Sequence, residues 1–150
     1  MDVYNKEAVQ AVWARVTASK EQSLGDFYKH ELQAVESYRR LAMRFPKQQN
    51  LFLSLARDEE RHARQLAALY YLQFGCAVSR TAEQTELPSE LCQAVRECYH
   101  GETDAVQRYT AAAEQFPAQY GLFTALAADE ARHADRLLAL MQTIPIRFNK

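Results

Sequence analysis

The sequence DEERHARQL, at residues 58–66, recurs as DEARHADRL at residues 129–137. The same offset of 71 residues places residues 28–69 on residues 99–140 without a gap, and about half of the paired positions are identical. Unrelated chains of average composition would share roughly one position in sixteen. The chain therefore consists largely of two copies of one unit.

The identical positions of the repeat are spaced three and four residues apart, which is the spacing of one helix face. In the first copy they include residues 31, 34, 35, 38, 42, 45, 48, 51, 52, 55, 59, 62, 63, 66 and 69. Between them the copies differ, as at Arg39 against Thr110. We expect the shared face to be buried, although it contains glutamates and histidines.

Helical periodicity and the positions of proline predict helices near 5–18, 22–45, 47–74, 88–116 and 118–142. Pro46, Pro88 and Pro117 each suit the first turn of a helix, where the missing N–H costs nothing. We predict an all-α four-helix bundle built from two helical hairpins, about 22–74 and 88–142, with a short extra N-terminal helix. It forms a single domain over residues 1–150. The polar segment 75–87 spans at most about 43 Å when extended, so both a long and a short connection between the hairpins stay open.

The composition is that of an ordinary globular protein, with 48% hydrophobic and 25% charged residues. A net charge of -1 gives no reason to expect nucleic acid or an anionic membrane as partner. No apolar run approaches the roughly 20 residues of a membrane span. The start of the chain does not resemble a signal peptide, and the three cysteines include no CxxC pair. We therefore expect a cytoplasmic protein with reduced thiols.

Six side chains on the shared face form a candidate metal site. Glu31 lies 14 residues before Phe45 and Glu59 lies 13 residues after Pro46, so an antiparallel hairpin brings both glutamates to the same level. A lone Glu-x-x-His usually forms surface ion pairs, but here the motif occurs twice, each time with a partner glutamate. The predicted ligands are Glu31, Glu59, His62, Glu102, Glu130 and His133. Two divalent cations would cancel four carboxylates, and this donor set suits iron, manganese or zinc.

The segments ELQAVESY, DEERH, ETDAVQRY and DEARH resemble the four ligand helices of the ferritin-like superfamily, and of rubrerythrin-type proteins in particular. The resemblance covers about residues 28–142 and implies a long crossover between the helix pairs. It also implies two iron ions bridged by Glu59 and Glu130, which react with hydrogen peroxide or dioxygen. The cysteines of a rubredoxin domain are missing, so a separate electron donor such as a rubredoxin is expected. Many rubrerythrins have a further glutamate where this chain has Ala105.

Four residues beside the predicted ligands also repeat. Asp58 and Asp129 each precede a ligand glutamate, and we expect them to orient an imidazole; the alternative is an ion pair with a nearby arginine. Tyr38 and Tyr109 lie two turns after a ligand glutamate on the same face. They resemble rubrerythrin tyrosines that bind a ligand glutamate or pass an electron, and ordinary core tyrosines are the alternative.

The sequence leaves several functions open. A peroxidase or oxidase using two iron ions is the leading hypothesis. Iron oxidation and storage as in ferritins, a di-iron oxygenase, and a zinc or purely structural site are the alternatives. Val12 and Trp13 give the first helix an apolar face that packs on the bundle or on a second subunit, and we expect a homodimer.

Overall fold

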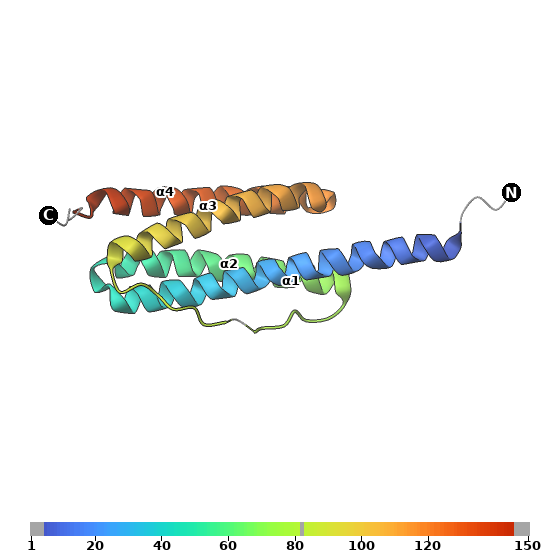
Figure 1. Cartoon of the computed structure of the whole chain (residues 1–150), viewed down its shortest axis with the longest axis horizontal. Coiled ribbons are helices and arrows are strands. Elements are labelled where there is room, and N and C mark those ends of the chain that lie inside the picture. The colour runs from blue at the N-terminus through green and yellow to red at the C-terminus, as the bar shows by residue number, and fades with distance from the viewer. Residues whose placement is uncertain (1–4, 82, 146–150) are drawn as a thin grey trace. The chain divides into compact units, whose positions relative to one another are not determined.

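The computed structural model describes residues 5–81 and 83–145, and within them it contains helices and no strand (Figure 1). The elements are α1 (Lys6–Arg44), η1 (Pro46–Gln48), α2 (Gln49–Phe74), α3 (Leu91–Gln115), η2 (Pro117–Gln119) and α4 (Tyr120–Thr143), where η marks a single 3₁₀ turn. The all-α class is confirmed. None of the helices in these two ranges is long and apolar enough to cross a membrane.

The chain divides into two compact units, with the boundary between Thr85 and Glu86. Unit 1 contains the hairpin of α1 and α2, and unit 2 contains the hairpin of α3 and α4. In both hairpins the turn is a phenylalanine followed by a 3₁₀ turn that starts with proline. The corresponding residues Phe52 and Phe123 are fully buried beside these turns. The two repeats of the sequence are therefore two hairpins of the same construction.

Most of the face that the repeat predicted to be buried is buried within each hairpin, whereas positions beside the turn, such as Gln48 and Leu51, are half-buried. The fully buried positions of unit 1 include Leu55 and Leu66, and the corresponding Leu126 and Leu137 are fully buried in unit 2. By contrast Arg39 and Thr110, where the copies differ, are exposed. Burial of these apolar side chains is the main stabilising contribution to each hairpin.

The expected break between an N-terminal helix and the first long helix is absent, and that prediction was wrong. Residues 5–18 and 22–45 belong to α1, which runs without interruption from Lys6 to Arg44. The helix starts where the side chain of Asn5 accepts hydrogen bonds from the N–H groups of Glu7 and Ala8. Thr17 and Ser19 lower helix propensity by only a few tenths of a kcal/mol each, which is too little to end a helix.

The third helix starts later than predicted. Pro88 was expected in its first turn, but α3 begins at Leu91, with Glu90 as the residue before it. The first backbone hydrogen bond of this helix runs from the N–H of Ala94 to the carbonyl oxygen of Glu90. Proline is compatible with a first helical turn but does not require one, so Pro88 stays in the connecting segment.

The segment after α2 follows α1 back towards the hairpin turn. Gly75 ends α2 in the left-handed conformation, with φ 70°, which glycine adopts without strain. Arg40, near the turn end of α1, donates a hydrogen bond of 2.8 Å to the carbonyl oxygen of Thr85. The connection is therefore the long one of the two that the sequence allowed, and it crosses unit 1 from one end of the hairpin to the other (Figure 1).

Candidate metal centre

Glu31, Glu59 and His62 meet inside unit 1 and form the first triad. Glu31 lies on α1, while Glu59 and His62 lie one turn apart on α2. All three are buried, with at most 4% of each residue exposed. Nδ1 of His62 is 3.1 Å from Oε2 of Glu59 and 3.7 Å from Oε2 of Glu31. Two carboxylates thus converge on one ring nitrogen in the middle of the hairpin.

Glu102, Glu130 and His133 form the second triad, inside unit 2. Glu102 lies on α3, and the other two lie one turn apart on α4. Nδ1 of His133 is 3.1 Å from Oε2 of Glu130 and 3.6 Å from Oε2 of Glu102. The second triad therefore has nearly the same geometry as the first, although the two hairpins share only about half of their paired residues.

The length of the helices on either side of each turn explains how the triads form. Glu31 lies about 21 Å before the turn of its hairpin, at 1.5 Å per residue, and Glu59 lies a similar distance after it. The three-residue step from glutamate to histidine then keeps both side chains on the face that meets α1. The predicted grouping of one glutamate with each Glu-x-x-His is what the structure shows within each unit.

The donor atoms of each triad suit a divalent cation. In each triad one donor atom per residue lies within 4.8 Å of the others. Two donors that bind an ion at about 2.1 Å and at a right angle lie about 3 Å apart, close to the histidine–glutamate separation in both triads. Two buried carboxylates also carry two negative charges that are costly away from water. One divalent cation per triad would cancel that charge while the imidazole stays neutral, so the residues fit metal ions.

Asp58 and Asp129 lie at the edge of the triads and form ion pairs with arginines. Arg61 donates a hydrogen bond of 2.8 Å to Oδ1 of Asp58, and Arg132 forms the corresponding ion pair with Asp129. Both arginines are exposed. These pairs do not occupy every oxygen of the two carboxylates, and the orienting of an imidazole by either aspartate stays a prediction.

Tyr38 and Tyr109 are buried between the triads and the hairpin turns. The ring of Tyr38 stacks on Phe52 with centroids 6.2 Å apart, and the ring of Tyr109 lies 6.1 Å from Phe123. Both tyrosines are at most 3% exposed. Packing in the core is therefore part of their role, and their contact with a ligand glutamate stays a prediction.

Two side-chain pairs at the open ends of the hairpins were not predicted from the sequence. In unit 1 the hydroxyl of Tyr70 donates a hydrogen bond of 2.7 Å to Oε1 of Glu21. This hydrogen bond, together with burial, raises the pKa of Tyr70 to about 12. In unit 2 the corresponding positions are Cys92 and Met141, whose sulfur atoms are 3.6 Å apart. The repeat could not reveal these pairs because their residues differ between the copies.

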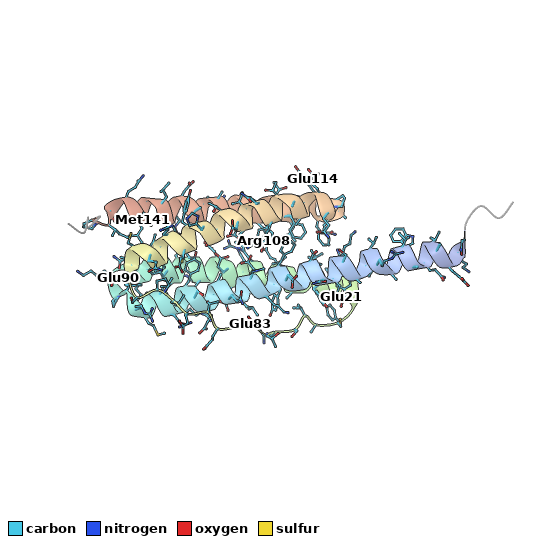
Figure 2. All side chains as sticks on the ribbon, in the orientation of Figure 1. Glu21, Glu83, Glu90, Arg108, Glu114 and Met141 are labelled. Atoms are coloured by element: carbon cyan, nitrogen blue, oxygen red, sulfur yellow. The ribbon has the colours of Figure 1, made fainter. Side chains whose placement is uncertain are left out.

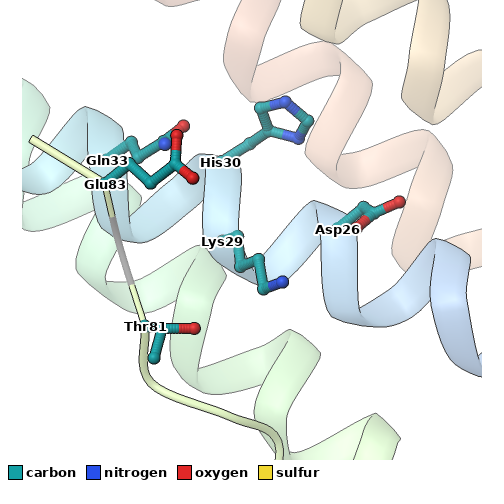
Figure 3. A pocket seen from close by; sticks show the side chains of 6 residues that line it. All are labelled: Asp26, Lys29, His30, Gln33, Thr81 and Glu83. Carbon is teal, nitrogen blue, oxygen red and sulfur yellow. The ribbon is translucent and has the colours of Figure 1, made fainter. Parts of the chain in front are cut away.

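A polar pocket on unit 1 was also not predicted. It lies between α1 and the connecting segment, as Figure 3 shows, and Glu83 of that segment lies beside Gln33 of α1. Its lining residues are Asp26, Lys29, His30, Gln33, Thr81 and Glu83. The lining carries both signs of charge and therefore favours no single class of ligand.

Comparison with known proteins supports the resemblance seen in the sequence. Residues 93–147 match the family model described as Rubrerythrin. This segment contains the whole second triad, from Glu102 on α3 to His133 on α4. No curated protein matches the chain. The similarity to rubrerythrin-type, ferritin-like proteins is therefore confirmed over residues 93–147.

Proposed function

We propose that this chain is a rubrerythrin-like oxidoreductase that uses two iron ions to reduce hydrogen peroxide or dioxygen. Electrons would come from a separate donor protein, such as a rubredoxin. The observation that carries the proposal is the presence of two buried Glu-Glu-His triads with matching distances. The match of residues 93–147 to the rubrerythrin family favours iron over a purely structural ion.

In this proposal the two hairpins would pair as one four-helix bundle, and the two triads would form one centre. Glu59 and Glu130 would be shared by the two ions, while Glu31, His62, Glu102 and His133 would each hold one ion. The likeness of the two hairpins supports this arrangement, since two similar units pair readily about a two-fold axis. Two divalent cations would balance the four carboxylates of the complete centre.

Reduced iron would supply two electrons to the O–O bond of peroxide, which yields two water molecules when two protons are added. The buried side chains of the two triads would hold the ions and exclude bulk water. Each imidazole presents Nδ1 to the carboxylates of its triad. A bound ion would take the place of the proton on this nitrogen, so the imidazole would stay neutral. The hydroxyls of Tyr38 and Tyr109, which are buried on the repeated face, are the candidates to donate protons.

Ala105 distinguishes this chain from many rubrerythrins. It is buried one turn after Glu102, at the position where those proteins have a further glutamate. A carboxylate at this position is not needed for the two triads, so the proposed metal set is complete without it. The substitution bears instead on whether the iron reacts faster with peroxide or with dioxygen.

Anaerobic loading with ferrous iron tests the proposal. We expect two iron ions per chain, fast oxidation by hydrogen peroxide and slow oxidation by dioxygen, followed in the optical spectrum. Fast oxidation by dioxygen would favour an oxidase, an oxygenase or ferritin-like storage, and sedimentation would then separate a cage from a small oligomer. Failure to bind iron in stoichiometric amounts, or iron that peroxide leaves unchanged, would refute the redox proposal.

A further inference from the structure

The first part of α1 projects beyond the hairpin of unit 1. The hydrogen bond between Tyr70 and Glu21 shows which levels of α2 and α1 face each other, and Figure 2 marks Glu21 on α1. Because α2 ends at Phe74, four residues after Tyr70, its end is level with about residue 17 of α1. Residues 6–16 of α1 therefore extend about 16 Å past α2, at 1.5 Å per residue (Figure 1).

This projecting part carries a stripe of exposed apolar side chains. The exposed fractions are 39% for Val9, 53% for Val12, 67% for Trp13 and 40% for Val16. Their spacing is that of one helix face. The face that packs on α2 includes Leu24, and its continuation in steps of three and four runs through Glu21, Thr17, Ala14 and Gln10. The apolar stripe is therefore a separate surface, of the kind that marks a protein contact.

We propose that this stripe binds the same stripe of a second copy of the chain, with the two helices antiparallel. The four positions are symmetric about the midpoint between Val12 and Trp13. An antiparallel pair centred there places Val9 opposite the partner's Val16, and Val12 opposite the partner's Trp13. A two-fold contact between identical chains requires such a self-complementary surface, which an unrelated partner would not require.

The charged residues of α1 agree with the antiparallel arrangement. In this register Lys6 lies opposite the partner's Ser19, and Arg15 lies opposite the partner's Gln10. No two like charges of residues 6–19 then face each other. A parallel pair in register would instead bring Lys6 against the partner's Lys6 and Arg15 against the partner's Arg15.

The association is expected to be reversible because the stripe is short. Standard stable interfaces bury about 800 Å² on each partner, and one face of about three helical turns provides less than that. The interface should therefore form and dissociate over an accessible range of protein concentration. It involves no triad residue, so its failure would leave the proposed iron chemistry untouched.

Sedimentation of the full chain over a range of concentrations tests the contact. Trp13 is the single tryptophan of the chain, so its fluorescence should shift to shorter wavelength as the dimer forms. We expect Trp13→Ala to raise the dissociation constant at least tenfold. Met43→Ala is the matched control, because Met43 is 74% exposed at the other end of α1. A chain that stays monomeric, or a dimer that Trp13→Ala leaves unchanged, would overturn the proposal.

Cysteine crosslinking tests the direction of the helices. In a chain whose three native cysteines are changed to serine, Val9→Cys combined with Val16→Cys should form disulfides between two chains. Val9→Cys alone should not, because two copies of residue 9 lie about 10 Å apart along antiparallel helices. Crosslinking by Val9→Cys alone would contradict the antiparallel arrangement.

Discussion

Replacing Glu59 by glutamine tests whether the two triads share one metal centre. The change keeps the size of the side chain and removes a buried negative charge that lies 3.1 Å from Nδ1 of His62. If Glu59 bridges both ions, as proposed, Glu59→Gln should weaken the binding of both. If each triad binds its own ion independently, the variant should lose one ion and keep the other.

The size of the effect follows from the number of ions. An ion present at a hundred times its dissociation constant stabilises the folded protein by about 2.7 kcal/mol, so two ions contribute about 5 kcal/mol. For a chain of this length each kcal/mol raises the melting temperature by about 2–4 °C. Metal should therefore raise the melting temperature of the wild type by about 10–20 °C. If each triad binds its ion independently, metal should raise the melting temperature of Glu59→Gln by about half as much as that of the wild type. If the two triads share one centre, metal should raise it only a little.

The assay combines metal content with thermal unfolding. Each protein is stripped with a chelator, reloaded anaerobically with ferrous iron, and measured by elemental analysis and calorimetry. Glu60→Gln is the matched control, since Glu60 is the next residue of α2 and forms surface ion pairs with Arg39 and Arg64. This control should behave like the wild type. A Glu59→Gln protein that keeps two ions and the full increase would refute the assignment of Glu59 as a ligand.

Two further predictions concern the hairpins themselves. Tyr70→Phe should lower the free energy of unfolding by about 1 kcal/mol at neutral pH, because the hydrogen bond to Glu21 is lost. The pKa of Tyr70 is about 12 in the folded protein against 10.0 for the free side chain. The stability that this hydrogen bond contributes should therefore be lost as the pH rises from 10 through 12. Urea unfolding checks the cost, and the tyrosinate absorbance should lose a step near pH 12 in Tyr70→Phe but not in Tyr71→Phe. Phe52→Ala and Phe123→Ala should each cost about 3–5 kcal/mol, because both rings are fully buried. A cost below 1 kcal/mol in urea unfolding at either position would contradict the repeated core.

The sequence predicted the buried faces and the two triads because two copies of one hairpin keep the same residues at the positions that pack in the same way. A position such as Leu55 or Leu66 keeps its residue in both copies where the neighbouring helix leaves no room for another shape. The glutamates and histidines of the triads stand on that face, so their burial followed from the same pattern. The pairing of each Glu-x-x-His with one glutamate then followed from helix lengths.

The features that the sequence did not predict depend on contacts rather than on periodicity. The continuity of α1 through Thr17 and Ser19 depends on the sum of small propensities over a 39-residue helix. The path of the crossover depends on the bond from Arg40 to Thr85, which joins residues 45 positions apart. No local sequence pattern predicts the hydrogen bond from Arg40 to Thr85, since neither residue is among the positions that are identical in the two copies.

The ends and the middle of the hairpins have diverged to different extents, and the reason is electrostatic. At the open ends, the pair of Glu21 and Tyr70 in unit 1 corresponds to Cys92 and Met141 in unit 2. Such a pair lies near water, so either member can change without leaving a charge in the core. In the triads each carboxylate is buried, and its charge must be matched by the same number of cationic charges. Losing one donor would unbalance the others, so both copies are expected to keep all three donors for as long as they bind metal.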